Sequence, residues 1–581
     1  MLEPTPTINS TLPTRASGFA RLTDALDYAA RGETGLNFYS ARGELVERLP
    51  YAQLRADAIG LARKLIAAGF APGERVAMIA ETHGDFMRAF FGCQYAGLVA
   101  TPLPLPATFG GRQAYVEQIS RQMQFSGASA VFGPAELKEF VDEAAAQVPS
   151  LRLNGVLAEM HEAAPDGVML PEIDPQQLSY LQYSSGSTRF PVAAAVTHAA
   201  AMSNTTAITR HGLHIGRGDR CTSWLPLYHD MGLIGFMMTP VACQMSVDYI
   251  ATRDFARRPL LWLQLISRNG GTLSFSPSFG YDLCSRRART AKVEGVDLSS
   301  WRCAGIGADM IRPNVLAEFI ERFAPHGFRP GAFVPSYGLA ESTLAVSFAP
   351  LGRGFDVDRV DLDRVAEDVA EPAGPETRRT RDFVLCGVPM PDHAVEIRRA
   401  DGSLCGQREI GRVYTRGPSL MREYFAKPEE TAAVMDSAGW LDTGDLGYWI
   451  GDQIVITGRM KDLIIVNGRN LWPQDLEWSV EREVEGLRSG DVAAISVDQG
   501  ERERVVLLVE CRLRKPAERA DLAQRISGAV QSLHGTECDV VLVPPHALPQ
   551  TSSGKLSRSR ARQSYLRGEY DEVAVPAASG G

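Results

Sequence analysis

RVAMIAETHGDFMRAFFGCQYAGLVATPLPLPA, residues 75–107, changes element type twice and decides the fold class. Residues 75–81 form a short apolar run that is typical of a strand, and residues 85–97 predict a helix. Residues 98–107 are again apolar, but they contain three prolines, which we expect to end any regular element there. The stretch thus predicts a strand–helix unit followed by a break.

The same alternation extends outward on both sides. Apolar residues recur at helical spacing before the stretch, at Leu54, Ala58, Leu61 and Leu65, and Gly69 is placed to stop that helix. Similar units recur at residues 195–250 and 255–320. Strands that alternate with helices imply a parallel sheet with helices on its faces. We therefore predict an α/β fold.

Length and composition limit the kind of protein. A chain of 581 residues is too long for one core and predicts at least two domains. Its 45% hydrophobic and 22% charged residues are ordinary for a soluble globular protein. A net charge of −9 argues against binding to nucleic acid, which needs a basic surface.

The cysteines and the N-terminus indicate a cytoplasmic protein. Nine cysteines are scattered singly, without metal-ligand or redox spacing, so we expect reduced and mostly buried thiols. The first twenty residues lack the apolar core of a signal peptide, and no apolar run approaches the roughly 20 residues that span a bilayer. We expect no integral membrane segment.

Two segments depart from the general pattern. Residues 350–382 are charged and poor in large apolar groups, which fits either a solvated surface excursion or an inserted module. Residues from about 459 onward contain three strand-like runs, enough for a small separate core. We place a domain boundary there, giving domains at 1–458 and 459–581, and we expect the residues after about 570 to be frayed.

SSGSTRFPVAAAVTH, residues 184–198, has the composition of a phosphate-binding loop. Serines, glycine and threonine place backbone N–H groups and hydroxyls in a tight turn that suits a polyphosphate. The sequence lacks the Gly-Lys-Ser/Thr end of a Walker loop, and Val192 stands where a lysine would be expected. The nearest cation is Arg189.

Six further motifs follow this loop: WLPLYHDMGL (224–233), GIGADM (305–310), PSYGLAES (335–342), WLDTGDLGYW (440–449), ITGRMKDLIIVNGRN (456–470) and LPQTSSGKLSR (548–558). In this order the seven motifs resemble those of the adenylate-forming superfamily, which includes acyl-CoA synthetases, luciferases and peptide-synthetase adenylation domains. The resemblance implies a large N-terminal domain with parallel-sheet subdomains and a small, mobile α+β C-terminal lid. It also implies the reaction of a carboxylate with ATP to give an acyl adenylate and pyrophosphate.

The obstacle in that reaction is electrostatic, because a carboxylate attacks the α-phosphate of a polyanion. Catalysis must then come from cations and positioning more than from general bases. By the resemblance, Lys555 bridges the carboxylate and the α-phosphate. Glu341 is the implied Mg²⁺ ligand, with Thr188 a second contact, since a hard cation prefers oxygen ligands. His229 is implied to gate the acyl site and contact the reacting carboxylate.

The resemblance also assigns the nucleotide site. Tyr337 offers a ring for adenine stacking, Asp445 could accept hydrogen bonds from the ribose hydroxyls, and Arg459 could reach ribose or phosphate. Lys461 falls at the implied hinge between the domains. The full set of expected ATP and AMP contacts is Ser184, Ser185, Gly186, Ser187, Thr188, Arg189, Gly307, Ala308, Asp309, Ser336, Tyr337, Gly338, Leu339, Ala340, Ser342, Asp445, Ile456 and Arg459.

Several features resemble one branch, the fatty acyl-AMP ligases that supply polyketide and peptide synthetases. The loop has Arg189 and no lysine, and residues 350–382 match the insertion of that branch. In the branch the insertion restrains the lid, so the acyl group passes to the phosphopantetheine arm of an acyl carrier protein rather than to CoA. Phe279 and Tyr281 are candidate walls of the fatty-acid pocket. Ala193 and Ala194 depart from the branch and would stiffen the loop, with consequences for pyrophosphate handling.

Three alternatives remain open from the sequence. A fatty acyl-CoA synthetase would have the same fold. An amino-acid adenylating enzyme could use Asp230, which lies about where those relatives hold the substrate ammonium. A nucleotide-binding protein without catalysis would explain the altered loop. A basic run after Lys555, formed by Arg558, Arg560, Arg562 and Arg567, fits either a carrier-protein contact or a solvated helix face.

Overall fold

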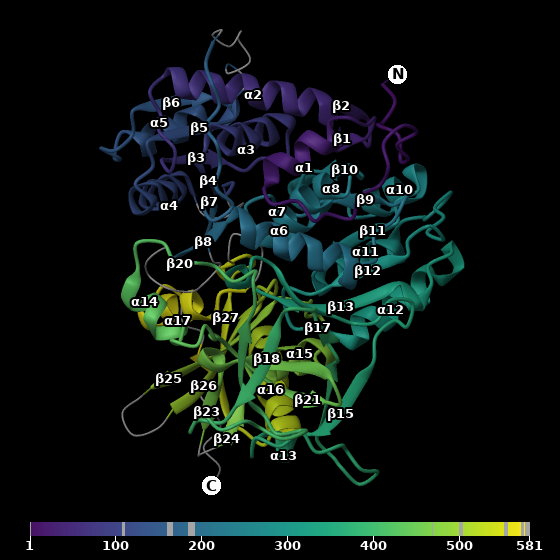
Figure 1. Cartoon of the computed structure of the whole chain (residues 1–581). Coiled ribbons are helices and arrows are strands. Elements are labelled where there is room, and N and C mark those ends of the chain that lie inside the picture. Colours follow the sequence, from purple (N-terminus) through teal and green to yellow (C-terminus); the bar gives the residue numbers. More distant parts are fainter. Residues whose placement is uncertain are drawn as a thin grey trace.

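The computed structural model describes residues 2–106, 111–157, 159, 167–183, 192–466, 469–498, 503–550, 556–570 and 574–575. Mixed α/β structure runs through both ends of the chain, so the predicted fold class is confirmed. Figure 1 shows the N-terminal sheets and helices in the upper part of the molecule, and the C-terminal elements packed below them.

The first sheet has seven strands in the order β20-β8-β7-β4-β3-β5-β6. Its strands are β3 (Arg75–Ile79), β4 (Val99–Leu103), β5 (Ala130–Gly133), β6 (Leu153–Val156), β7 (Leu178–Tyr183), β8 (Ala193–Thr197) and β20 (Glu423–Tyr424). Strands β3 to β7 pair in parallel, whereas β8 is antiparallel to both of its neighbours. The associated helices are α2 (Tyr51–Ala67), α3 (Gly84–Ala96), α4 (Gly111–Ser126) and α5 (Lys138–Ala145). The strand and both helices predicted around residues 54–97 are thus confirmed.

Pro102 corrects the expectation that the prolines of residues 98–107 end regular structure. It lies inside β4, opposite Met78 of β3. The other neighbour, β7, pairs with β4 at Ala100. Proline has no N–H to donate to a neighbouring strand. It is tolerated at position 102 because β4 pairs with β7 only at Ala100, two residues earlier.

The alanines at 193–195 also correct an expectation. They form the buried strand β8, in which Ala194 pairs with Gln182 of β7 and with Tyr424 of β20. Ala193 and Ala195 pack in a cluster with Val99 and Leu181. Their small size is therefore a packing feature of a buried strand, and any effect on pyrophosphate handling stays a prediction.

The second sheet has nine strands in the order β17-β14-β13-β12-β11-β9-β10-β1-β2. These are β1 (Gly35–Tyr39), β2 (Leu45–Pro50), β9 (Arg220–Ser223), β10 (Ser246–Ile250), β11 (Leu273–Ser276), β12 (Cys303–Ile306), β13 (Phe333–Gly338), β14 (Ala345–Phe348) and β17 (Val388–Pro389). The helices of this part are α1 (Leu22–Ala29), α6 (His198–Ala207), α7 (Asp230–Leu233), α8 (Thr239–Ala242), α9 (Thr252–Arg257), α10 (Leu260–Asn269), α11 (Ser278–Thr290) and α12 (Pro313–Phe323). Two five-residue π-helical segments, η3 (Ile208–Gly212) and η4 (Ile234–Met238), continue α6 and α7.

A four-stranded antiparallel sheet leads toward the C-terminal part. It contains β18 (Ala394–Arg398), β19 (Gly411–Arg416), β21 (Leu441–Ile450) and β22 (Gln453–Arg459), and α14 (Pro428–Val434) precedes β21. Within residues 350–382, β15 (Val357–Asp361) pairs antiparallel with β16 (Thr380–Val384), and α13 (Leu362–Val365) lies between them. Val360, Val365 and Phe383 are buried in one cluster with Tyr448 and Trp472. The segment is therefore a packed module and not merely a solvated excursion.

The residues from Ile464 onward build their own cores. Two clusters contain only residues of this part, one on each side of the strands β25 (Val492–Asp498), β26 (Glu503–Glu510) and β27 (Cys538–Val543). The other elements are η8 (Met460–Asp462), β23 (Ile464–Val466), β24 (Arg469–Leu471), α15 (Pro473–Glu483), α16 (Pro516–His534), α17 (Arg558–Leu566) and β28 (Ala574–Val575). This arrangement agrees with a boundary near Arg459, and the mobility of the C-terminal lid stays a prediction.

The cysteines and helices bear on the remaining expectations. All nine cysteines are free thiols, and every one except Cys405 is buried. Among the described residues, no helix combines the length and apolar character needed to cross a membrane.

Candidate functional site

The turn after β13 places Glu341 at the edge of the second sheet. The chain reverses through η7 (Ala340–Ser342), and Thr343 adopts a positive φ of 67° before β14 begins. Gly338 is required because a Cβ there would lie 1.9 Å from the carbonyl oxygen of Leu344. Buried Asn204 of α6 fixes the turn by donating to the carbonyls of Ser342 (3.3 Å) and Ala345 (2.9 Å). Sequence reasoning did not identify Asn204.

Glu341 is held between the two large sheets. Its Oε1 accepts a hydrogen bond of 2.7 Å from the hydroxyl of Tyr424, which lies on β20 of the first sheet. Its backbone carbonyl accepts from the amide of Met421 at 2.7 Å. Burial, followed by the nearby charge of Glu341, raises the pKa of Tyr424, so this hydroxyl stays a proton donor. Tyr424 is a second functional candidate that the motifs did not reveal.

A second carboxylate lies beside this turn. The hydroxyl of Tyr337 donates to Oδ2 of Asp445 at 2.7 Å, and Nε of Arg459 lies 3.4 Å from Oδ1. The β21–β22 hairpin creates the pair, because its register sets Asp445 opposite Arg459. Burial raises the pKa of Asp445, while the charge of Arg459 acts in the opposite sense. Asp445 raises the pKa of Arg459 most strongly, and Glu341 contributes to the same shift.

The expected base-covering loop lies next to Tyr337. β12 pairs in parallel with β13, and Ile306 at the end of β12 lies opposite Pro335. Gly307, the next residue, therefore lies beside Ser336 and Tyr337. A Cβ on Gly307 would approach the carbonyl oxygen of Ser336 to 2.7 Å, which explains the glycine. Ala308 has a positive φ of 67°, and Asp309 is exposed.

The other expected nucleotide contacts differ in accessibility. Ser336, Gly338, Leu339 and Ala340 are half-buried along the same edge. Ser342 is fully buried, and its carbonyl is engaged by Asn204. Ile456 is half-buried in β22 and packs against the main core.

His229 stands at the start of α7 and is oriented by its neighbour. Its Nδ1 lies 2.7 Å from Oδ1 of Asp230, and the amide of Met231 donates to the same oxygen at 2.7 Å. Nδ1–H can therefore donate to Asp230, although the amide of Met231 also lies within hydrogen-bonding distance of Nδ1, at 3.4 Å. The amide of Gln182 donates to the carbonyl of Tyr228 at 2.7 Å and joins this segment to β7. Asp230 is thus engaged with His229 in this structure, which weakens its assignment as an ammonium ligand.

The lid approaches the same region through Arg558. This largely buried guanidinium donates to both oxygens of Glu477, at 2.7 and 2.6 Å, and to Asp462 at 3.4 Å. Burial acts to lower its pKa, but the charges of Glu477, Asp462 and Asp309 raise it. Lys461 lies in η8 beside this contact, and burial lowers its pKa. Its role as a hinge stays a prediction.

The basic run after Lys555 does not form one free cationic surface. Arg558 is committed to Glu477, Arg562 donates to the carbonyl of Ser496, and Arg567 pairs with Glu569. Among the described residues, Arg560 is exposed and is the one arginine of this run without an assigned hydrogen bond or ion pair. The arrangement favours the solvated helix face over a carrier-protein contact.

Two sets of expected site residues lie outside the described residues. They are the loop residues Ser184, Ser185, Gly186, Ser187, Thr188 and Arg189, and the lysine Lys555. Their neighbours are described: Tyr183 and Val192 flank the loop, and Arg558 follows Lys555 by three positions. The assignments to these residues stay predictions.

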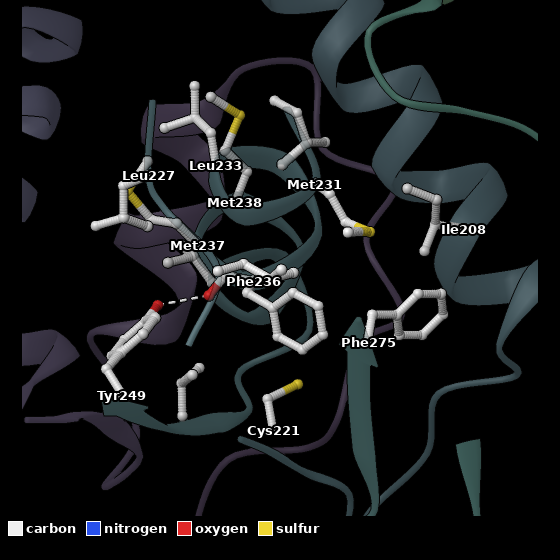
Figure 2. Close-up of a cluster of buried hydrophobic side chains, with 14 of the residues drawn as sticks. Ile208, Cys221, Leu227, Met231, Leu233, Phe236, Met237, Met238, Tyr249 and Phe275 are labelled. Atoms are coloured by element: carbon white, nitrogen blue, oxygen red, sulfur yellow. Dashed lines mark hydrogen bonds between the residues drawn. The ribbon is translucent and has the colours of Figure 1, made fainter. Parts of the chain in front are cut away.

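An apolar cavity lies among elements of the second sheet and its helices, and neither His229 nor Glu341 is among its wall residues. Its walls are Ile208, Leu213, Ile215, Cys221, Met231, Gly235, Phe236, Thr239, Met245, Leu273, Phe275, Leu344 and Phe348. Met231 is two residues beyond His229, and Leu344 is three residues beyond Glu341. Figure 2 shows Met231, Phe236 and Phe275 turned toward one region, with Ile208 and Cys221 at its edges.

Tyr281, an expected acyl wall, lies elsewhere. It is fully buried among aromatic rings, including Trp301, Phe319 and Phe333, and its hydroxyl donates to the carbonyl of Gly305 at 2.8 Å. Phe279 contacts Trp224 and is not among the walls of this cavity. Helical periodicity explains the difference, because residues of α11 that face the aromatic core cannot also face the cavity. Phe275, on β11, is the wall residue of this region.

The fold and the site together define an adenylate-forming enzyme. Residues 32–425 match the family of AMP-binding enzymes, and the chain belongs to that family. The resemblance to its fatty acyl-AMP ligase branch is confirmed by the relatives that follow.

A putative acyl-CoA synthetase of Caulobacter vibrioides is 53% identical over 96% of this chain and 97% of its own. The medium-chain-fatty-acid–[acyl-carrier-protein] ligase JamA of Moorena producens is 32% identical over 95% of this chain and 96% of its own. A structure from a study of fatty acyl-adenylate ligases of E. coli and L. pneumophila superposes with a TM-score of 0.92 at 42% identity, covering 96% of this chain and all of that one.

Proposed function

We propose that this enzyme activates a fatty acid with ATP and passes the acyl group to the phosphopantetheine arm of an acyl carrier protein. The observation that carries the proposal is the apolar cavity, whose wall residues Met231 and Leu344 follow His229 and Glu341 closely in the sequence. An apolar cavity suits the alkyl chain of a fatty acid.

In the proposed reaction, a carboxylate oxygen attacks the α-phosphorus of ATP, the bond to the bridging oxygen breaks, and pyrophosphate leaves. Arg459 offers positive charge close to Asp445, and Asp445 would accept hydrogen bonds from the ribose hydroxyls. Lys555 would supply the cation between the two reacting anions. His229, oriented by Asp230, would hydrogen-bond the carboxylate at the entrance of the cavity.

Glu341 is suited to hold Mg²⁺, with Thr188 as its partner in the proposal. A carboxylate has about four lone-pair sites, so the bond from Tyr424 leaves capacity for a cation. A bound Mg²⁺ would neutralise phosphate charge. The free thiols support a reducing compartment, and the proposal therefore places the reaction in the cytoplasm.

The choice of a carrier protein over CoA is supported by contacts between the 350–382 module and the lid. Buried Arg381 donates to Asp475 of α15 at 2.8 Å, and Arg379 donates to the carbonyl of Leu533 of α16 at 3.0 Å. These bonds hold the lid against the module. A lid that cannot rotate freely would disfavour the second half-reaction with CoA.

The acceptor can be tested by measuring acyl transfer from enzyme-bound acyl-AMP to a phosphopantetheinylated carrier protein and to CoA. We expect transfer to the carrier protein and little to CoA. The variant Arg381→Met should raise transfer to CoA, with Arg359→Met, on the exposed face of β15, as the control. Rapid use of CoA by the unmodified enzyme would instead identify an acyl-CoA synthetase, the function suggested by the name of the Caulobacter relative.

A further inference from the structure

Thr343, two residues beyond Glu341, has a strained backbone. Its φ of 67° and ψ of −60° place it at the centre of a γ-turn, which the amide of Leu344 closes by donating to the carbonyl of Ser342 at 2.8 Å. This form of γ-turn is rare, and a β-branched residue seldom adopts it. Thr343 is fully buried, so the protein packed around it must hold the conformation.

Asn204 holds the γ-turn from both sides. Its side-chain nitrogen donates to the carbonyls of Ser342 and Ala345, at 3.3 and 2.9 Å, and its side-chain oxygen accepts from the amide of Ala345 at 3.1 Å. These bonds act on the backbone, which glycine at position 343 would adopt without the steric cost that threonine bears. What threonine adds at this position is its side chain.

The side chain of Thr343 binds a second segment, residues 417–425. Its hydroxyl donates to the carbonyl of Ser419 at 2.6 Å, and Ser419 is fully buried, so this carbonyl needs a donor from the protein. The imidazole of His393 lies between Ser419 and Pro391, with Nε2 2.6 Å from the hydroxyl oxygen of Ser419 and Nδ1 2.9 Å from the carbonyl oxygen of Pro391. Nδ1–H therefore donates to Pro391, and Nε2 accepts from Ser419. Both the carbonyl and the side chain of Ser419 are thus fixed.

The same segment, residues 417–425, makes the two bonds that hold Glu341. The amide of Met421 donates to the carbonyl of Glu341, and the hydroxyl of Tyr424 donates to its Oε1, each at 2.7 Å. With the bond from Thr343, the turn and the segment are joined at three points. The Thr343 bond is the one whose donor lies on the turn.

The segment is also tied to the first sheet. The amides of Arg422 and Phe425 donate to the carbonyls of Ala195 and Ala193 of β8, at 2.9 and 2.8 Å. In the sequence, β8 comes shortly after the expected phosphate loop. The segment therefore joins the turn of Glu341 to the strand that follows this loop.

We propose that Thr343 is a positioning residue for Glu341, because its bond to Ser419 keeps the turn in the strained form that holds the carboxylate against Tyr424. The inference rests on the proposed function, in which Glu341 holds Mg²⁺. Without the bond, the turn can relax to an ordinary φ, and the carboxylate then loses its fixed direction. Binding of ATP with Mg²⁺ should weaken, whereas binding of ATP alone should not.

The test measures the dissociation constant of ATP, without fatty acid, in Mg²⁺ and in EDTA. We expect Mg²⁺ to tighten the binding of ATP to the unmodified enzyme. Thr343→Val keeps the shape of the side chain and Thr343→Gly removes the strain, but both lack the hydroxyl. Each should lose about tenfold of the gain from Mg²⁺, the scale of one neutral hydrogen bond, with an unchanged dissociation constant in EDTA. Thr343→Ser should keep the gain.

Two further variants separate positioning from a general loss of structure. Thr34 is fully buried, and its hydroxyl donates to the carbonyl of Gln244 at 2.9 Å, next to β1 and toward the other end of the same sheet. Thr34→Val is the matched control and should bind ATP as the unmodified enzyme does, in Mg²⁺ and in EDTA. In a Glu341→Gln background, Thr343→Val should weaken binding no further, since coupled residues are not additive.

The inference would be overturned by several results. These are no gain from Mg²⁺ in the unmodified enzyme, a full gain in both Thr343→Val and Thr343→Gly, an equal loss in Mg²⁺ and EDTA, and an undiminished loss in the Glu341→Gln background. If the unmodified enzyme adenylates no fatty acid, the proposed function fails. The ATP measurements need no fatty acid, so they still decide the role of Thr343.

Discussion

At the scale of single residues, the site depends on hydrogen bonds between segments far apart in the chain. Tyr424 and Glu341 are joined across two sheets, and Tyr337 and Asp445 across two strands of different sheets. Each bond fixes the direction of a carboxylate that the proposed reaction uses. Loss of one bond should therefore reduce activity more than stability.

The first prediction concerns Tyr424→Phe. This change removes the hydroxyl that orients Glu341, and a hydrogen bond to a charged group contributes about 1.5–3 kcal/mol. We expect acyl-AMP formation to fall about tenfold to a hundredfold. The matched control is Tyr28→Phe, on α1. This change removes a hydroxyl that donates to the carbonyl of Pro13. Equal rates for the two variants would contradict the role of Tyr424.

The second prediction concerns Asp230, which we expect to act through His229. Asp230→Ala should reduce kcat for adenylation because the imidazole loses the partner at Nδ1. In a His229→Ala background the same change should have almost no further effect, since coupled residues are not additive. Independent, multiplying losses would show that Asp230 acts in another way.

At this scale, sequence reasoning proposed site residues only where a motif marked them, and their roles stay predictions. The motifs identified Glu341, Asp445 and Arg459, and the structure brings these three together. The sequence motifs did not identify Asn204 or Tyr424, because the importance of these two residues comes from contacts between residues distant in the chain. Tyr281 lies in the aromatic core and outside the walls of the apolar cavity, and proximity to a motif does not reveal which face of α11 a residue occupies.

At the scale of elements, α15 connects the lid to the rest of the enzyme. It presents Asp475 to Arg381 of the 350–382 module, Glu477 to Arg558 and Glu481 to Arg312 of the N-terminal part. The strand-like runs of the lid were predicted from short apolar stretches, and β25, β26 and β27 confirm them. The identity of β8 was missed because three alanines beside a serine- and glycine-rich run resemble a loop.

The third prediction follows from Glu481. Burial raises its pKa to about 7, although Arg312 acts in the opposite sense. The pKa of Glu481 in the folded state exceeds the ordinary pKa of a glutamate carboxyl. Between that ordinary pKa and about pH 7, the folded state therefore binds more protons than the unfolded state. This group should therefore add stability as the pH falls through that range, by up to about 3 kcal/mol.

Glu481→Gln should remove that contribution. We expect the melting temperature of the variant to gain less than that of the unmodified enzyme when the pH is lowered from neutral. The control is Glu485→Gln, an exposed position just beyond the end of α15. Identical pH profiles for the unmodified enzyme and Glu481→Gln would show that Glu481 does not titrate as inferred.

At the scale of the whole molecule, the two large sheets meet at a common edge that bears the charged residues. The seven-stranded sheet supplies Tyr424, the nine-stranded sheet supplies the turn of Glu341, and the antiparallel sheet supplies Asp445 and Arg459. The apolar cavity lies among elements of the second sheet and its helices, and the lid contacts the rest of the chain through Glu481 with Arg312 and Asp475 with Arg381. The α/β class followed from local patterns, but the meeting of the sheets depends on long-range packing that those patterns do not contain.

The most direct test of fatty-acid activation is the formation of acyl-AMP and pyrophosphate from ATP and fatty acids by the unmodified enzyme and by Lys555→Ala. We expect formation that depends on the fatty acid in the unmodified enzyme, and loss of nearly all of it in the variant with an unchanged melting temperature. Amino acids should not replace the fatty acid. Unchanged acyl-AMP formation by Lys555→Ala, or pyrophosphate release that amino acids stimulate and fatty acids do not, would contradict the account.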